Sequence, residues 1–277
     1  MSTFKITKKD LSLQALESLI DECSQNQKLQ NDKEVQMIIN TGKKKIELVK
    51  DFVPRIIPLT HCKLNHPKDV RILLITKDPS TIYREAIEKD DSVKDLIKEV
   101  ITVKNLKRRF KGSKMVTLYH EFDLVVADYR VHHLLPKILG ARFFSGTKKI
   151  PFVIKMSKQV KMRGEKLNEE CDTKYIRAQL KSITKNAYYL PNQDNCLTIR
   201  IGNIDKQSEG DMLNNAIDII NFLTDPTKTP QGGIIKSGIA SIFVKTEHSA
   251  SLPLYEAKTT KNNQKRNYDE ELKNFKL

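Results

Sequence analysis

The chain has few of the features that mark a secreted, metal-binding or membrane protein. It contains only four cysteines in 277 residues, and none of them forms a Cys-x-x-Cys pair. Scattered cysteines are expected to be reduced thiols in an intracellular protein. No stretch approaches the roughly 18 to 20 apolar residues that span a bilayer, and the amino terminus lacks the apolar core of a signal peptide. We therefore expect a soluble intracellular protein with no membrane partner.

Glycine is missing where a nucleotide-binding protein needs it. A dinucleotide fingerprint places three glycines after a buried strand, but the chain continues from Ile75 with residues 76–80 (Thr-Lys-Asp-Pro-Ser). Residues 41–43 (Thr-Gly-Lys) are similar to part of a phosphate-binding loop. However, Met37 stands where the leading glycine belongs, and Lys44 stands where Ser or Thr should follow. Both nucleotide interpretations therefore fail.

Candidate catalytic and metal-binding groups are incomplete. Asp123 and Asp128 flank an apolar run, but acids at strand ends more often cap the next turn than act as a catalytic pair. His61, Cys62 and His66 could begin a zinc site, although a tetrahedral site needs four ligands and no partner pair occurs elsewhere. No grouping of Ser, His and Asp suggests a nucleophilic triad. We predict a protein that is not an enzyme and that binds no metal or cofactor.

Positive charge is what the chain has in abundance. It carries 49 Lys and Arg residues against 34 Asp and Glu residues, which gives a formal net charge of +15. A chain this basic attracts polyanions, and RNA is the commonest of these inside a cell. The alternative is a lysine-rich surface that is merely well solvated, and composition alone does not separate the two.

The apolar pattern predicts a mixed α/β protein. The middle third alternates strands and helices, which favours a parallel sheet with crossover helices. The first and last thirds combine strands with longer amphipathic helices. We expect helices at 11–24, 81–89, 93–101 and 131–139 and from about 172 and 208, and strands at 35–40, 54–59, 70–75, 124–127, 151–155, 188–190, 197–201 and 239–245.

This order of elements predicts two domains and a tail. Residues 1–66 and 148–256 would form a discontinuous α+β domain that holds both termini, and residues 67–147 would form an inserted α/β domain. The polar segment around Pro67 marks the first boundary. Residues 257–277 are mostly charged or amide residues and are expected to be a polar tail.

Basic residues gather in three clusters, which we predict contact phosphates. On the helix that begins near Asp172, Ile176, Leu180 and Ile183 fall on one side and the cations on the other, so this helix would present a cationic ridge. For each cluster the alternative is a solvated face. The predicted RNA-binding cations are Lys43, Lys44, Lys45, Arg55, Lys155, Lys161, Arg163, Arg177, Lys181 and Lys185, and a secondary basic surface would comprise Lys107, Arg108, Arg109 and Lys111.

The order of several motifs resembles the ribosomal protein L-one family. These motifs are residues 123–128 (Asp-Leu-Val-Val-Ala-Asp), 135–140 (Leu-Pro-Lys-Ile-Leu-Gly), 197–202 and 232–238, and the resemblance extends over about residues 10–255. Residues 104–114 and 126–136 are similar to the fungal nucleolar members of the family. The resemblance implies an α+β domain interrupted by a Rossmann-like domain, with two hinge segments between them.

The resemblance also implies a function. It points to a non-catalytic ribosome-biogenesis factor in the nucleolus, bound to precursor ribosomal RNA in the early small-subunit particle, the small-subunit processome. The protein would be a monomer among other assembly factors. Two alternatives remain open, namely a large-subunit assembly factor on the internal transcribed spacer and a protein-interaction scaffold within pre-ribosomes.

The family also implies where RNA would be held. Its ribosomal members bind RNA near the first strand and through a Thr-Met-Gly turn after the last strand. This chain departs from the pattern, because Asp32 and Lys33 precede Glu34 where an aromatic residue is usual, and residues 246–253 lack the methionine and the glycine. The candidate contacts in this turn are Thr246, Ser249 and Ser251.

Overall fold

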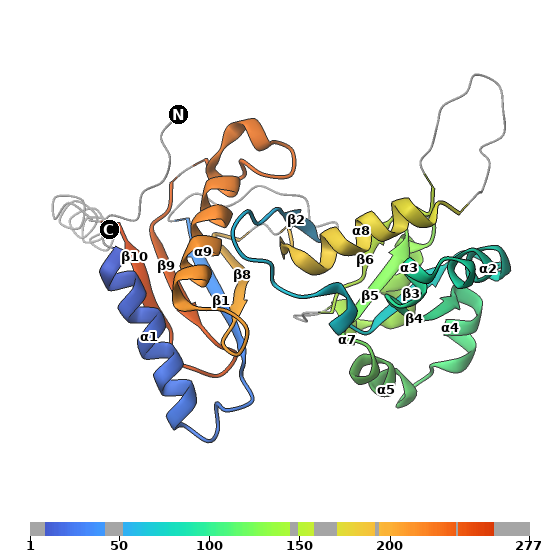
Figure 1. The fold of residues 1–277 in the computed structure, drawn as a ribbon, viewed down its shortest axis with the longest axis horizontal. Helices are drawn as coiled ribbons and strands as arrows, with labels where there is room; N and C mark the ends of the chain where they lie inside the picture. Colours follow the sequence, from blue (N-terminus) through green and yellow to red (C-terminus); the bar gives the residue numbers. More distant parts are fainter. Residues whose placement is uncertain are drawn as a thin grey trace, which may run out of the picture.

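A computed structural model describes residues 9–41, 52–144, 149–157, 171–191, 194–236 and 238–257. These residues form two four-stranded sheets, and a short two-stranded ribbon lies between them (Figure 1). None of the described helices is both long enough and apolar enough to cross a membrane.

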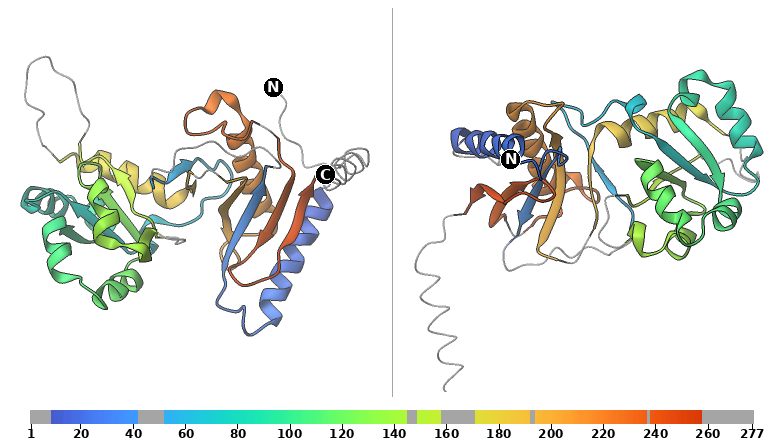
Figure 2. Two further views of the ribbon diagram at one scale, coloured as in Figure 1. Left: turned by 180° about the vertical axis from the view of Figure 1, so that it is seen from behind. Right: turned by 90° about the horizontal axis from the view of Figure 1, so that it is seen from below.

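The first sheet is antiparallel and is built from both ends of the chain. Its strand order is β10-β9-β1-β8. Along β1, buried residues alternate with half-buried ones, which is the pattern of a strand with one face on a core. Helices α1 and α9 supply that core and lie on the same side of the sheet (Figure 2). The elements are α1 (Lys9–Gln25), β1 (Glu34–Asn40), β8 (Cys196–Asn203), α9 (Glu209–Thr224), β9 (Ser241–Lys245) and β10 (Leu252–Glu256).

The second sheet is parallel, with strand order β4-β3-β5-β6. All five residues of β3 are buried, as expected for a strand that is covered on both faces. Helices α2, α3 and α8 pack on one face, and α4 to α7 pack on the other. The elements are β3 (Ile72–Thr76), α2 (Thr81–Lys89), α3 (Asp91–Lys94), β4 (Ile97–Thr102), α4 (Val103–Arg109), α5 (Lys114–Glu121), β5 (Leu124–Asp128), α6 (Leu135–Leu139), α7 (Ala141–Phe144), β6 (Phe152–Ile154) and α8 (Thr173–Lys185).

The ribbon consists of β2 (Arg55–Ile57) and β7 (Ala187–Tyr189), which pair antiparallel. Three short 3-10 helices complete the described elements: η1 (Pro67–Asp69), η2 (His132–Leu134) and η3 (Pro226–Lys228). The chain passes through β2 on its way to the second sheet and returns through β7 after α8. The ribbon therefore joins the outgoing and returning segments of the backbone.

The predicted α/β fold class is confirmed, but several local predictions differ from the structure, and helices α4, α5 and α7 are absent from the prediction. The helix expected at residues 93–101 ends at Lys94, and Ile97–Thr102 form the edge strand β4. Burial along β4 does not alternate, so its sequence carries no period-two signal, and pairing with β3 decides its conformation. Strand β10 is absent from the prediction, and Pro253 within it is tolerated because β10 lies at the sheet edge. The predicted helix at residues 131–139 is divided into η2 and α6.

The predicted boundary after residue 147 also lies too early. Strand β6 does not return to the first sheet but pairs parallel with β5, where Phe152 is opposite Val126. Helix α8 follows it and packs on the same sheet. The physical reason is the core, because Ile154 and Leu180 both belong to the apolar cluster beneath that sheet. We propose that the inserted domain ends near residue 185, just before β7.

Candidate nucleic-acid interface

Helix α8 has the amphipathic character that the sequence predicts. Asp172 caps its amino end, because the Asp172 carboxylate accepts a hydrogen bond from the Tyr175 backbone N–H at 3.0 Å. Ile176, Leu180 and Ile183 are buried against the second sheet. The helix is therefore firmly anchored along one side.

The opposite side of α8 is a narrower cationic ridge than predicted. Lys181 and Lys185 are half-buried, and no described residue forms an ion pair with either of them. Arg177 is half-buried, and its Nε atom is shielded from solvent. Hydrogen bonds from Ser92 and Thr173 lower the pKa of Asp90, and the Arg177 charge adds to this effect. Of the three cations predicted to contact RNA on α8, Lys181 and Lys185 remain for the ridge, and the exposed Lys174 lies on the same helix.

The other predicted cations are spread over several elements. Lys155 is exposed at the end of β6, where its backbone N–H donates to Gln179 Oε1 at 3.0 Å and its carbonyl accepts from Gln179 Nε2 at 2.8 Å. Since Gln179 belongs to α8, Lys155 is held beside that helix. Arg55 lies in the ribbon, and its guanidinium donates to the Pro230 carbonyl at 3.4 Å. The predicted contacts Lys43, Lys44, Lys45, Lys161 and Arg163 lie outside the described residues.

The turn between β9 and β10 uses two predicted RNA contacts to hold its own shape. Thr246 is fully buried and Ser249 is nearly so. The Thr246 backbone N–H donates to Ser249 Oγ at 2.9 Å, and that hydroxyl donates to the Ala250 carbonyl at 3.0 Å. The Thr246 hydroxyl faces α1, where it accepts from Cys23 Sγ at 3.9 Å, and the Ser249 hydroxyl is engaged within the turn. Both predicted contacts are therefore poorly placed to reach RNA. Ser251 is exposed and stays a candidate.

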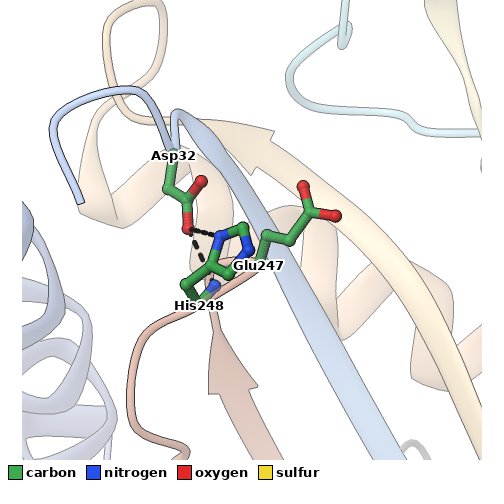
Figure 3. A group of neighbouring side chains, drawn as sticks. All are labelled: Asp32, Glu247 and His248. Atoms are coloured by element: carbon green, nitrogen blue, oxygen red, sulfur yellow. Dashed lines mark hydrogen bonds and ion pairs between the residues drawn. The ribbon is translucent and has the colours of Figure 1, made fainter. Parts of the chain in front are cut away.

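A carboxylate ties this turn to the segment that enters β1. Asp32 Oδ2 accepts a hydrogen bond from the His248 backbone N–H at 2.8 Å and lies 2.9 Å from His248 Nδ1 (Figure 3). The Asp32 side chain is only 10% exposed, whereas that of His248 is 69% exposed. Asp32, Glu247 and His248 each offer a ligand atom within 4.8 Å of the others, but a tetrahedral metal site needs a fourth. The arrangement fixes the turn.

Nearby cations are matched by acids of the chain itself. Lys33 Nζ lies 3.0 Å from Asp205 Oδ1, and Arg200 Nη1 lies 2.9 Å from Glu34 Oε1. An RNA phosphate would have to compete with these carboxylates for the same cations. This end of the first sheet is therefore a weaker anion-binding surface than the α8 ridge.

The secondary basic surface lies around a groove between α4 and α6. Lys107, Arg108 and Lys111 line the groove as predicted, and Lys104 and Lys137 join them. Arg109 does not, because its Nη1 lies 2.6 Å from Glu99 Oε1 on β4. Lys104 lies three residues before Lys107 and four before Arg108, so helical spacing places it on the same face, and its membership of this surface could have been predicted from the sequence. Lys137 comes from a helix distant in sequence, and only the fold places it here.

The acids at the two ends of β5 each form an ion pair with a different arginine. Asp128 is fully buried and accepts a hydrogen bond from Arg130 Nε at 2.9 Å. Asp123, at the other end of the strand, accepts from Arg71 Nη2 at 2.7 Å. The hydrogen bond from Arg71 is the main cause of the lowered pKa of Asp123, and partial burial of the carboxylate opposes the change. Each carboxylate is thus the partner of an arginine.

His61, Cys62 and His66 do not converge on one point either. His61 Nδ1 lies 3.2 Å from Asp218 Oδ2, and Cys62 Sγ accepts a hydrogen bond from Gln207 Nε2 at 3.4 Å. His66 accepts from the backbone of η1. Among the described residues these three side chains form no common ligand set.

Comparison with known proteins decides the family. The model of the ribosomal protein L1p/L10e family matches residues 21–250. The chain belongs to this family. The Saccharomyces cerevisiae protein named ribosome biogenesis protein UTP30 is 56% identical over 272 residues, which cover 98% of each chain. The predicted family membership and the resemblance to fungal members are both confirmed.

More distant relatives of this L1p/L10e member are longer proteins. The mouse protein named ribosomal L1 domain-containing protein 1 is 26% identical over 212 residues, which are 74% of this chain and 41% of the mouse protein. A Schizosaccharomyces pombe protein, whose name assigns it provisionally to ribosome biogenesis, is 27% identical over 68% of this chain and 46% of its own length. The match to this chain therefore spans less than half of the length of either protein.

Proposed function

We propose that this protein is a non-catalytic ribosome-biogenesis factor that binds precursor ribosomal RNA in the early small-subunit particle of the nucleolus, next to other assembly factors. The observation that carries the proposal is the 56% identity, over 98% of each chain, to a yeast protein named for ribosome biogenesis. The formal charge of +15 supports RNA as the partner. The neutralised carboxylates Asp123 and Asp128 offer no pair for acid–base chemistry.

The ridge of Lys181 and Lys185 is a surface suited to RNA phosphates. Both lysines lie on a helix anchored by three buried side chains, so little further ordering is needed on binding. Lys155 is fixed beside the same helix. A phosphate contact releases counterions, and each one contributes about 0.7 to 0.9 to the slope of log affinity against log salt.

A double charge reversal tests this surface. The Lys181→Glu, Lys185→Glu variant should bind a fragment of small-subunit precursor RNA at least about tenfold more weakly at low salt, and its salt slope should fall by about 1.4 to 1.8. Fluorescence anisotropy across a salt titration measures both quantities. A matched control is Lys89→Glu, Lys98→Glu, which makes the same charge change at exposed positions of α2 and β4. Equal losses in the two variants would exclude the ridge as the binding surface.

A separate experiment tests which pre-ribosomal particle contains the protein: the protein is crosslinked to RNA in cells, and the bound RNA is sequenced. Reads in the small-subunit precursor support the proposal. Reads in the internal transcribed spacer would instead assign the protein to large-subunit assembly. Few reads, with co-purification of assembly factors that survives nuclease, would indicate a protein-interaction scaffold.

A further inference from the structure

The groove between α4 and α6 has the build of a binding site. It is a wide depression, largely open to solvent, with a volume of about 770 Å³. The partly buried Met115 and Ile138 contribute thioether and aliphatic surface to it, and Phe110 adds an aromatic ring. Its position on the helices of the second sheet separates it from the α8 ridge, which packs on the other face.

Its charged residues carry one sign. Five cations line the groove, and all five are exposed: Lys104, Lys107, Arg108, Lys111 and Lys137. In the part of the chain that the structure describes, no carboxylate forms an ion pair with any of them. The nearby Glu99 is already paired with Arg109, which does not line the groove. The Asp78 carboxylate accepts from the Lys104 backbone N–H at 3.3 Å, not from its ammonium group. The groove therefore combines an apolar surface with cationic side chains that form no ion pair among the described residues.

We propose that this groove binds an acidic peptide segment, carrying bulky apolar side chains, from a partner protein. Charge complementarity selects an anionic occupant. The apolar surface then selects a peptide over RNA, because bases are held by stacking on planar side chains. Among the described residues, Phe110 is the aromatic ring that lines the groove, and the Arg109 guanidinium already lies over it at 5.2 Å from its centroid. Aliphatic anchors beneath a charged rim match the helix-in-groove mode of peptide recognition.

This inference goes beyond the proposed RNA binding and does not depend on it. The two surfaces share no residue, since one comprises Lys155, Lys181 and Lys185 and the other lies on α4, the turn after it, the start of α5, and α6. The ridge variant Lys181→Glu, Lys185→Glu should keep peptide binding. A failure of one proposal is therefore distinguishable from a failure of the other.

Selection from a displayed library of short random peptides, with the full chain as bait, tests the groove. The enriched peptides should be acidic and should carry at least two large apolar residues. Fluorescein-labelled synthetic copies should bind the Lys107→Glu, Arg108→Glu variant at least about tenfold more weakly and Ile138→Ala about threefold to tenfold more weakly. The control variant Lys98→Glu, Lys114→Glu changes exposed lysines that do not line the groove and should bind as the unaltered protein does.

Competition with a single-stranded oligouridine separates the two classes of occupant. The proposal expects the RNA to leave the labelled peptide in place at physiological salt. It is overturned if the oligouridine displaces the peptide and loses affinity for the same groove variants, which would make this a nucleic-acid groove. It is equally overturned if the enriched peptides lack acidic residues, or if they bind the charge-reversed protein as tightly as the unaltered one. Circular dichroism of every variant confirms that it is folded.

Discussion

Replacing Asp128 with asparagine should be among the most damaging single changes in the second sheet. Asp128 ends β5 and is fully buried. Its carboxylate accepts from the Arg130 backbone N–H at 3.0 Å and from Arg130 Nε at 2.9 Å, and Arg130 Nη2 donates to the Tyr83 hydroxyl at 2.6 Å. The pair with Asp128, together with Tyr83, keeps the pKa of Arg130 well above its ordinary value.

The size of the effect follows from burial. The asparagine side chain of the Asp128→Asn variant would retain one acceptor oxygen but no charge, so Arg130, whose side chain is only 21% exposed, would lose its counterion. Removing one partner of a buried ion pair costs about 3 to 5 kcal/mol, and the retained acceptor favours the lower value. The matched control is Asp123→Asn at the other end of β5. Asp123 and Arg71 are 41% and 46% exposed, and exposed pairs contribute about 0 to 1 kcal/mol.

Urea unfolding at neutral pH, followed by far-ultraviolet circular dichroism, measures the difference. Because the chain holds separate cores under its two sheets, peptide-resolved hydrogen exchange of β3 and β5 should accompany it and report the second sheet directly. The Asp128→Asn variant should lose about 3 kcal/mol in the free energy of opening, and Asp123→Asn less than about 1 kcal/mol. Equal losses in the two variants would refute the reasoning that burial sets the strength of these pairs.

Three further outcomes are expected. Gly202→Ala should destabilise the first sheet by about 1 to 3 kcal/mol in urea unfolding, because an added Cβ would lie 2.4 Å from the buried Met212 Cγ. Unchanged stability would show that Met212 and α9 shift to accommodate the Cβ without cost. Burial raises the pKa of Cys171 to about 11, so iodoacetamide at pH 8 should alkylate it about a hundredfold more slowly than an ordinary exposed thiol. Peptide mass spectrometry measures the rate of alkylation, and a rate equal to that of an exposed thiol would contradict this prediction. Burial opposes ionisation of Asp218, but hydrogen bonds from Thr60 bring a net lowering of its pKa. The resulting stabilisation of the fold is present above the unfolded-state pKa and is lost as pH falls through the lower folded-state pKa. Asp218→Asn should therefore reduce the loss of stability below about pH 4, and an unchanged dependence of stability on pH would argue against the effect.

Much of the candidate interface could be predicted from the sequence, and the errors share one cause. Helical spacing identified α8 and its buried side, because i, i+4 and i+7 positions lie on one face whatever the helix packs against. Spacing could not show that the Arg177 Nε atom is buried, that Thr246 is buried, or that Arg109 pairs with Glu99. These contacts join residues from different elements, so they exist only after the elements have packed.

The sequence by itself determined the family, the α/β class, most strands and helices, and the excess of positive charge. These properties are local or additive, because periodicity and net charge depend only on which residues are present and in what order. Only the tertiary structure decided that β6 and α8 complete the second sheet, that β4 is a strand, and that Lys137 joins the cations of α4. Strand pairing and surface grouping depend on contacts between residues far apart in the chain, and those contacts are set by the lowest free energy of the whole molecule rather than by any short segment.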